Sequence, residues 1–392
     1  MTDVTPALLN GEDLLSVEAS EVRSPYDGAV VGSVPACTAD DLDRAVAIAV
    51  DRHRGGPPPA YERAAILDRA ALLLSERLDE FALSICRESA KPITTARVEA
   101  ERAVDTLRFS AGVARSMAGE MVAMDASSAG VGKLGFVLRV PVGPVAAISP
   151  FNFPLNLVCH KIGPAVAAGC PVVLKPASAT PLTALRIARL FEEAGLPPGW
   201  LNVVTCGGTV ANHLVEHPDI AMITFTGSPE VGWGIRARAA RKRVGLELGN
   251  NAPVIIEPSA DLDLAASKLA VGGYAFAGQT CISVQRVYAH RSIHSRFLDA
   301  FAARVAELRV GDPLAPATNV SALINSAETE RVAGWVDEAI SAGASLISGG
   351  DRSEAGVLRP TLVDGVTHDM KVVASEVFGP VVSVTRFSDV DE

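Results

Sequence analysis

The feature that most restricts the fold is a regular alternation of apolar runs and helical patterns between residues 140 and 225. Apolar runs predict strands, and the segments between them have helical spacing; the strands are 145–148, 172–174, 201–204 and 222–225, and the helices are 157–168, 181–194 and 209–216. Strands that alternate with helices form a parallel sheet covered by helices on both faces. The alternation therefore predicts an α/β fold.

Each of these strands is followed by small, polar or cationic residues. The four tips are Ser149-Pro150-Phe151-Asn152, Lys175-Pro176-Ala177-Ser178, Gly207-Gly208 and Thr226-Gly227-Ser228. Parallel sheets bind ligands at the carboxyl ends of their strands, and a glycine beside a serine at a helix start presents backbone N–H groups to a phosphate. The row of tips predicts a nucleotide site. Any single tip also suits an ordinary turn, and the GxGxxG fingerprint is absent.

Composition excludes several classes of function. The chain has 392 residues, 48% of them hydrophobic, and its 35 basic against 45 acidic residues give a net charge of −10. The basic run at 236–243 is interpreted as the solvated face of a helix, so we expect no nucleic-acid partner. The first 20 residues are acidic without an apolar core, and no apolar run is long enough for a membrane. Six cysteines without metal-binding spacing predict reduced thiols in the cytoplasm and no metal site.

The remaining segments flank this alternation. An extended segment is expected at 22–34, and helical spacing predicts helices over 40–50, 61–80, 81–89 and 94–119. The strand-like residues 136–140 are interpreted as one side of a hairpin arm that pairs with another element or subunit.

A lone cysteine and a lone carboxylate stand out in the second half. Cys281 follows Gly272, Gly273 and Gly278, which we expect to loosen the chain, and it is a candidate thiolate nucleophile. Glu247 lies between two apolar, strand-like runs, so we expect a carboxylate enclosed by apolar neighbours and suited to act as a general base. A buried, inert cysteine and a salt-bridged glutamate are the alternatives.

The sequence resembles the NAD(P)-dependent aldehyde dehydrogenase superfamily nearly from end to end. The motifs that carry the resemblance are Pro150-Phe151-Asn152-Phe153-Pro154, His160-Lys161-Ile162-Gly163-Pro164-Ala165, Lys175-Pro176, Phe225-Thr226-Gly227-Ser228, Leu246-Glu247-Leu248-Gly249, Gly278-Gln279-Thr280-Cys281 and Glu376-Val377-Phe378-Gly379-Pro380. The resemblance implies a Rossmann-type cofactor domain over residues 1–245, with a hairpin oligomerisation arm at about 120–143. It also implies an α/β catalytic domain over residues 246–392.

The resemblance also assigns roles. Cys281 matches the nucleophile, Glu247 the general base and Asn152 the oxyanion-hole donor, with Lys161 in the same site. The implied contacts of NAD or NADP are Ser149, Pro150, Lys175, Ser178, Thr226, Gly227, Ser228, Leu248, Glu376 and Phe378. The implied reaction converts an aldehyde, through a thiohemiacetal and a thioester on Cys281, into a carboxylic acid. The stretch 281–286 and His160-Lys161 are most similar to the branch acting on lactaldehyde-like or phosphorylated aldehydes, with Phe153, Leu157 and His160 lining the tunnel.

The chain departs from the family pattern at four places. Asn250 and Asn251 replace the usual glycine and lysine after the base, Phe151 replaces a common tryptophan, and Ser178 replaces a frequent glutamate; the turn at 206–209 is short. The chain also ends at Glu392, where relatives continue into the rest of the catalytic domain and an oligomerisation strand. We therefore expect an incomplete catalytic domain, and a dimer or tetramer only for a longer form. A truncated, catalytically silent NAD(P)-binding relative is the alternative function.

Overall fold

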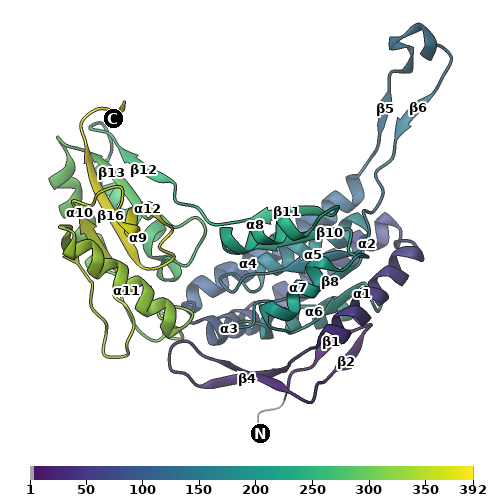
Figure 1. The fold of residues 1–392 in the computed structure, drawn as a ribbon, viewed down its shortest axis with the longest axis horizontal. Helices are drawn as coiled ribbons and strands as arrows, with labels where there is room; N and C mark the ends of the chain where they lie inside the picture. Colours follow the sequence, from purple (N-terminus) through teal and green to yellow (C-terminus); the bar gives the residue numbers. More distant parts are fainter. Residues whose placement is uncertain (1–3, 392) are drawn as a thin grey trace.

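The computed structural model describes residues 4–391, which form two lobes (Figure 1). The N-terminal lobe is built on a seven-stranded sheet of order β11-β10-β7-β8-β9-β1-β2, with bounds β11 Arg243–Glu247, β10 Met222–Thr226, β7 Val145–Ile148, β8 Val172–Lys175, β9 Leu201–Val203, β1 Ala7–Leu9 and β2 Glu12–Leu14. The five strands from β11 to β9 are parallel, as predicted, whereas β1 and β2 pair antiparallel.

Helices cover both faces of this sheet because its strands carry apolar side chains on both faces. Val145 and Ala147 of β7 pack in a core with helices α2 Ala60–Glu76, α3 Leu78–Ser89, α4 Ile93–Ser116, α5 Asn156–Ala168 and α6 Leu182–Glu193. Ala146 and Ile148 point to the opposite core, with α1 Ala39–Arg54, α7 Gly208–Glu216 and α8 Pro229–Arg238. Burial on both faces explains why the strands are apolar without alternation.

The C-terminal lobe is built on a five-stranded sheet. Its order is β12-β13-β16-β15-β14, with bounds β12 Pro253–Ile256, β13 Arg286–His290, β16 Val381–Phe387, β15 Thr361–Asp364 and β14 Ser345–Ser348. Only β14 is antiparallel to its neighbour. A separate apolar core joins this sheet to helices α9 Leu262–Tyr274, α10 His294–Ala306, α11 Ser326–Ser341 and α12 Lys371–Ala374.

Two antiparallel ribbons leave the N-terminal lobe. Strands β3 Ala19–Arg23 and β4 Val30–Pro35 form one of them under the molecule (Figure 1). Strands β5 Glu120–Val122 and β6 Gly135–Val137 form a hairpin arm that projects away from the body, with the 3-10 turns η1 Met124–Ala126 and η2 Ser128–Gly130 near its tip. The strand expected at 136–140 thus ends at Val137 and pairs with β5.

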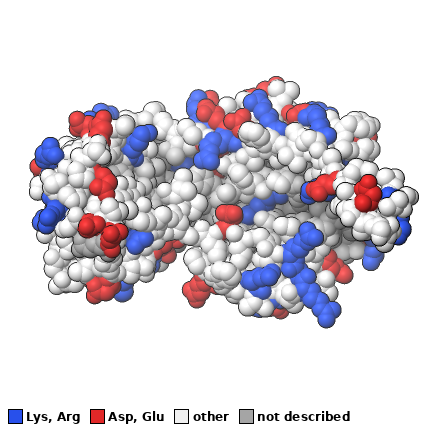
Figure 2. Space-filling view, turned by 90° about the horizontal axis from the view of Figure 1, so that it is seen from above, with Lys and Arg blue, Asp and Glu red and all other residues white. Residues whose placement is uncertain are grey.

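Other local predictions were wrong at their boundaries. The helices expected at 61–80 and 81–89 meet at Arg77, whose φ of −120° interrupts the helix, and not at residue 80. The basic run at 236–243 is not one helical face, because α8 ends at Arg238 and Arg243 begins β11. Over both lobes, acidic and basic side chains are interspersed (Figure 2). None of the helices in residues 4–391 has the length and apolarity needed to cross a membrane.

Candidate active site

Cys281 lies in a tight turn of the C-terminal lobe. The 3-10 turn η3 Ala275–Gly278 follows α9, and three consecutive residues, 276 to 278, have positive φ. At Gly278 a Cβ atom would lie 2.1 Å from the carbonyl oxygen of Gly379, so only glycine fits. Gly272 and Gly273 do not loosen the chain as expected, since they lie within α9, where a Cβ on Gly273 would meet Val382 of β16 at 2.5 Å.

The thiol of Cys281 differs from the other thiols of the chain. It is partly exposed, whereas the other five cysteines are buried, and all six are free. Burial raises the pKa of the Cys281 thiol, and the charges of Glu376 and Glu247 raise it further. Cys281 is therefore the accessible thiol, and in this state it holds its proton more firmly than an ordinary cysteine.

Glu247 ends β11 at the carboxyl edge of the large sheet. Its side chain is exposed, which corrects the expectation of an apolar enclosure: the strand lies at the sheet edge, so the side chain points to solvent. Its backbone carbonyl accepts a hydrogen bond from the N–H of Gly227 at 3.1 Å. The Glu247 charge acts on both Cys281 and Lys161, raising the pKa of each. The carboxylate thus lies within electrostatic reach of the thiol.

Asn152 lies in the turn between β7 and α5 and reaches across to the other lobe. Its side-chain Nδ2 donates to the backbone carbonyl of Gln279 at 2.9 Å, two residues before Cys281. The amide is 4% exposed, and its Oδ1 is buried without a partner in the described residues. The structure therefore brings Asn152 to the turn that carries Cys281, with one Nδ2 hydrogen uncommitted.

Lys161 is a buried amine on α5. Its Nζ donates to Thr226 Oγ1 at 2.8 Å and lies 3.4 Å from Thr224 Oγ1. Burial lowers the pKa of Lys161 to about 8, although the charge of Glu247 opposes the shift. Lys161 and His160 border a cavity of about 910 Å³ between α5, the base of the arm and β10.

The predicted cofactor residues line the carboxyl edge of the large sheet, and their chemistry fits a dinucleotide. Lys175 is buried at the end of β8, where burial lowers its pKa, and the buried hydroxyl of Ser149 has no partner among the described residues. Ser228 caps α8 by accepting from the N–H of Val231 at 3.4 Å, which leaves the start of that helix facing the edge. Ser178 is exposed and donates to the carbonyl of Cys206 at 3.2 Å.

The other predicted cofactor residues gather near the thiol. Glu376 accepts from the N–H of Asn250 at 3.1 Å, and burial raises the pKa of its carboxyl. A Cβ on Gly249 would meet Glu376 Oε2 at 1.9 Å, so the motif glycine makes room for this carboxylate. Phe378 has a φ of +49° and packs edge-on against Phe151, with ring centroids 6.0 Å apart. Pro150 is partly buried, and Leu248 packs against Gly232 of α8.

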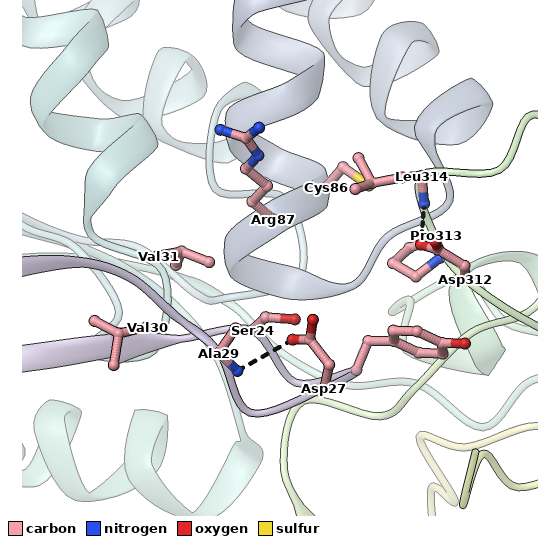
Figure 3. Close-up of a pocket in the computed structure, with 11 residues that line it drawn as sticks. Ser24, Asp27, Ala29, Val30, Val31, Cys86, Arg87, Asp312, Pro313 and Leu314 are labelled. Carbon is pink, nitrogen blue, oxygen red and sulfur yellow. Dashed lines mark hydrogen bonds between the residues drawn. The ribbon is translucent and has the colours of Figure 1, made fainter.

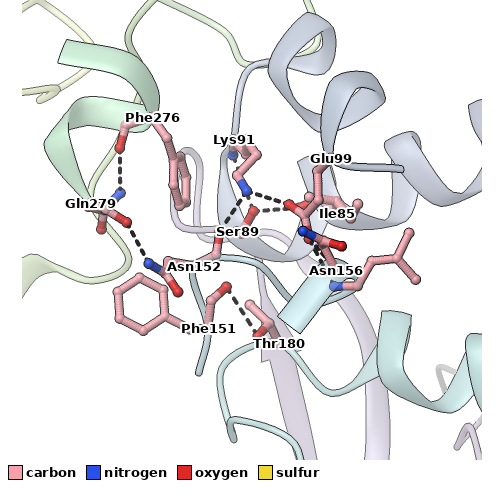
Figure 4. A network of polar contacts seen from close by, with 11 residues as sticks. Ile85, Ser89, Lys91, Glu99, Phe151, Asn152, Asn156, Thr180, Phe276 and Gln279 are labelled. Atoms are coloured by element: carbon pink, nitrogen blue, oxygen red, sulfur yellow. Dashed lines mark hydrogen bonds and ion pairs between the residues drawn. The ribbon is translucent and has the colours of Figure 1, made fainter. Parts of the chain in front are cut away.

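A buried ion pair that sequence reasoning missed lies beneath this site (Figure 4). Lys91 follows α3, and its ammonium contacts Glu99 of α4 and the backbone carbonyl of Asn152, the latter at 2.6 Å. The two side chains are 0% and 1% exposed. The sequence holds little signal for this pair, because a lysine before a proline and a glutamate in an amphipathic helix both suggest surface positions.

A second cavity lies apart from the predicted site residues. It has a volume of about 330 Å³ and is lined by the β3–β4 ribbon, α3 and the segment Asp312-Pro313-Leu314 (Figure 3). Asp27 accepts there from the N–H of Ala29 at 3.1 Å. Within residues 4–391 no cluster of three or more His, Cys, Asp or Glu side chains could hold a metal ion.

Comparison with known proteins identifies the class. The sequence model of the aldehyde dehydrogenase family matches residues 15–392, and the chain belongs to this family. Solved structures similar to this chain include enzymes named as NAD-dependent and as NADP-dependent dehydrogenases.

Individual relatives are similar over nearly the whole chain. The 3-sulfolactaldehyde dehydrogenase of Priestia aryabhattai is 44% identical over 98% of this chain and 80% of its own length. An NAD-dependent aldehyde dehydrogenase from Sinorhizobium meliloti has a TM-score of 0.95 at 38% identity, over 100% of this chain and 79% of that one. The NADP-dependent glyceraldehyde-3-phosphate dehydrogenase from Bacillus halodurans C-125, complexed with NADP, has a TM-score of 0.96 at 36% identity, covering 100% and 83%. These matches do not favour the silent-relative alternative.

Proposed function

We propose that the chain oxidises a small aldehyde to a carboxylic acid by covalent catalysis at Cys281. The observation that carries this proposal is the bond from Asn152 Nδ2 to Gln279, which ties a side-chain donor to the turn of the accessible thiol. NAD or NADP supplies the acceptor for the hydride that the aldehyde loses. The steps below assign a role to the thiol, to the hydrogen-bond donors and to the carboxylate that this chain supplies.

The first half-reaction forms a carbon–sulfur bond. Because the pKa of Cys281 is raised, its proton has to be removed before or during attack, and water can accept it because the thiol is partly exposed. The thiolate then adds to the carbonyl carbon. The resulting oxyanion accepts hydrogen bonds from Asn152 Nδ2 and the N–H of Cys281; losing one such donor typically costs about 10²–10³ in rate. Loss of hydride from the same carbon leaves a thioester.

The second half-reaction releases the acid. Glu247 takes a proton from water, the resulting hydroxide adds to the thioester, and the carbon–sulfur bond breaks to return the thiolate. An exposed side chain suits this role, because it can release to bulk water the proton taken in this step and so return to the carboxylate form.

We propose an aldehyde that carries an anionic group, such as a sulfonate or a phosphate. Arg102 of α4 is exposed and has no ion-pair partner among residues 4–391. Burial lowers the pKa of His160, and the charge of Arg102 lowers it further. Thr106, one turn further along α4, donates to Asn156 Oδ1 at 2.9 Å and lies 3.4 Å from His160 Nε2. This cluster gives an anion one fixed charge and several polar partners beside the tunnel-lining His160. The similarity to a 3-sulfolactaldehyde dehydrogenase supports the same class.

The substrate proposal is tested with one charged and one uncharged aldehyde. Arg102→Ala should raise KM for 3-sulfolactaldehyde or glyceraldehyde 3-phosphate by about 10-fold or more, as expected for loss of a charge-assisted bond, and leave KM for propionaldehyde unchanged. Arg108→Ala is the matched control, because Arg108 is exposed on the same helix and lies 3.6 Å from Asp105. An equal effect of Arg102→Ala on both aldehydes would refute the proposal.

The organisation of the molecule belongs to the same proposal. We assign residues 1–245 to cofactor binding and 246–392 to catalysis, since the two lobes have separate sheets and cores, although β11 of the large sheet extends across this boundary to Glu247. We also propose a homo-oligomer that assembles through the arm, whose apolar side chains are exposed, and a cytoplasmic location consistent with six free thiols.

A further inference from the structure

The buried ammonium of Lys91 has an unusually complete set of partners. It donates to Glu99 Oε2 and to the carbonyl of Asn152, and it faces two aromatic rings, 3.8 Å from the Phe153 centroid and 4.6 Å from that of Phe276. Two oxygens and two ring faces satisfy a cation that has no access to water. Burial nevertheless lowers the pKa of Lys91, and the charge of Glu99 opposes this shift.

Glu99 fixes the other end of the same turn. Its Oε1 accepts from the backbone N–H groups of Leu155 and Asn156, at 3.0 and 3.1 Å. These N–H groups open α5, which has no side-chain cap of its own. A carboxylate from another helix therefore caps α5, and its negative charge interacts favourably with the positive end of the α5 dipole. Together, Lys91 and Glu99 hold the turn from Asn152 to Asn156 at both ends.

The same ammonium reaches the turn that carries the thiol. Phe276, with a φ of +49°, presents its ring to Lys91 and its carbonyl to the backbone N–H of Gln279 at 3.1 Å. The backbone carbonyl of Gln279 in turn accepts a hydrogen bond from the Asn152 side-chain amide. Figure 4 shows these groups around one centre, with Lys91 between the Asn152 turn and the Phe276–Gln279 turn. Lys91 is thus the one charged group in this network that contacts both turns.

Such a pair is poorly explained by stability alone. Removing two charges from water is costly, and well-packed apolar residues often replace a buried ion pair without loss of stability. A geometric requirement explains its presence better, because the carbonyl of Asn152 and the Phe276 ring have to keep a fixed separation for the Asn152 amide to meet an oxyanion on Cys281.

We propose that Lys91, held by Glu99, is a positioning residue that sets the Asn152 amide against the Cys281 turn and so forms the oxyanion site. The inference rests on the proposed roles of Cys281 and Asn152. Lys91 itself touches neither the thiol nor the substrate. Its effect on the reaction passes through Asn152, and this distinguishes it from a residue that only supports the fold.

A double-mutant cycle tests this route. In single-turnover measurements of NAD(P)H formation, Asn152→Ala should slow the first half-reaction by about 10²-fold, and Lys91→Met by about 10-fold or more. In the Asn152→Ala background, Lys91→Met should have less than about a 3-fold further effect, because the amide it positions is gone. Arg97→Ala is the matched control, since Arg97 lies on α4 with Glu99 and forms an exposed ion pair with Asp79 of α3 at 2.6 Å. It should leave the rate unchanged.

A second readout separates positioning from loss of fold. Iodoacetamide should alkylate Cys281 in folded Lys91→Met while the five buried cysteines stay unmodified, as peptide mapping would show. Should Lys91→Met not fold, Glu99→Gln enters the same cycle, because it removes the charge that holds the ammonium. A folded variant with a wild-type rate, or the same rate loss with and without Asn152, would overturn the inference. Full activity of Asn152→Ala itself would instead overturn the proposed function.

Discussion

The side-chain amide of Asn250 donates to the backbone carbonyl of Cys281 at 2.6 Å, and this bond crosses between the two segments that carry the candidate base and nucleophile. The backbone N–H of Asn250 also donates to Glu376, and its backbone carbonyl accepts from Gln285 Nε2 at 3.2 Å. Gln285, through its Oε1, accepts the N–H of Val377. A residue at which the sequence departs from its family thus joins three segments around the thiol.

Asn250→Gly should therefore lower kcat/KM by about 5-fold, because one hydrogen bond that fixes the Cys281 turn contributes on the order of 1 kcal/mol. Steady-state kinetics with a fixed cofactor concentration measure the effect. Asn251→Ala is the control, since its amide donates to Val373 rather than to the thiol turn. Equal losses in both variants would show that the bond to Cys281 has no special role.

Cys281→Ala should abolish dehydrogenation, whereas Glu247→Gln should retain a single-turnover burst of reduced cofactor and then turn over slowly. The reason is that the thiol is needed for the first half-reaction and the carboxylate mainly for thioester hydrolysis. Rapid mixing with excess aldehyde separates the two phases. Wild-type steady-state turnover in Glu247→Gln would contradict the assignment.

Ser178→Glu should shift cofactor preference towards NAD. A carboxylate beside the adenosine ribose repels a 2′-phosphate and accepts a hydrogen bond from a free 2′-hydroxyl. Ser178 is exposed and close to the carbonyl of Cys206, so a longer side chain has room. The ratio of kcat/KM for NAD and NADP should change by about 10-fold or more. An unchanged ratio would place Ser178 away from the ribose.

Lys161 should make the free energy of unfolding increase with pH in the alkaline range. Its pKa is about 8 in the folded chain, against 10.5 when unperturbed, so between these values the unfolded chain binds more protons. The free energy of unfolding should then rise with pH by up to about 3 kcal/mol from this group, and the increment should be absent in Lys161→Met. Denaturant unfolding of both proteins from pH 7.5 to 10.5 measures it. A stability difference that stays constant over this range would contradict the prediction.

Phe136→Glu should weaken self-association. Phe136 is 59% exposed on the arm, beside Met121 and Leu138, so a carboxylate there would be desolvated in any interface that the arm forms. Light scattering over a concentration series gives the mass. Lys133→Glu, an exposed change near the arm tip, is the control. An unchanged mass for Phe136→Glu would exclude the arm from the interface.

The parallel core of the N-terminal lobe was predictable from sequence because its strands are uninterrupted apolar runs. Strands β1 and β2 were not, since three residues are too short to show a period. The exposure of Glu247 was also missed, because an apolar neighbourhood along the chain says nothing about which strand ends a sheet. Lys91 and Glu99 escaped notice for a similar reason: the partners that satisfy their charges lie on the Asn152 turn and α5, distant in sequence. Interactions between residues that are distant along the chain leave no pattern in the local sequence.

The ammonium of Lys91, which has no access to water, lies at the boundary between the two lobes. Phe153 from one lobe and Phe276 from the other face the same ammonium of Lys91, so pulling the lobes apart would strip the ion of one ring before solvent could replace it. This contact therefore opposes separation of the two lobes at this point. At the rim, where Glu247 and His160 are exposed to water, separation would desolvate no buried charge.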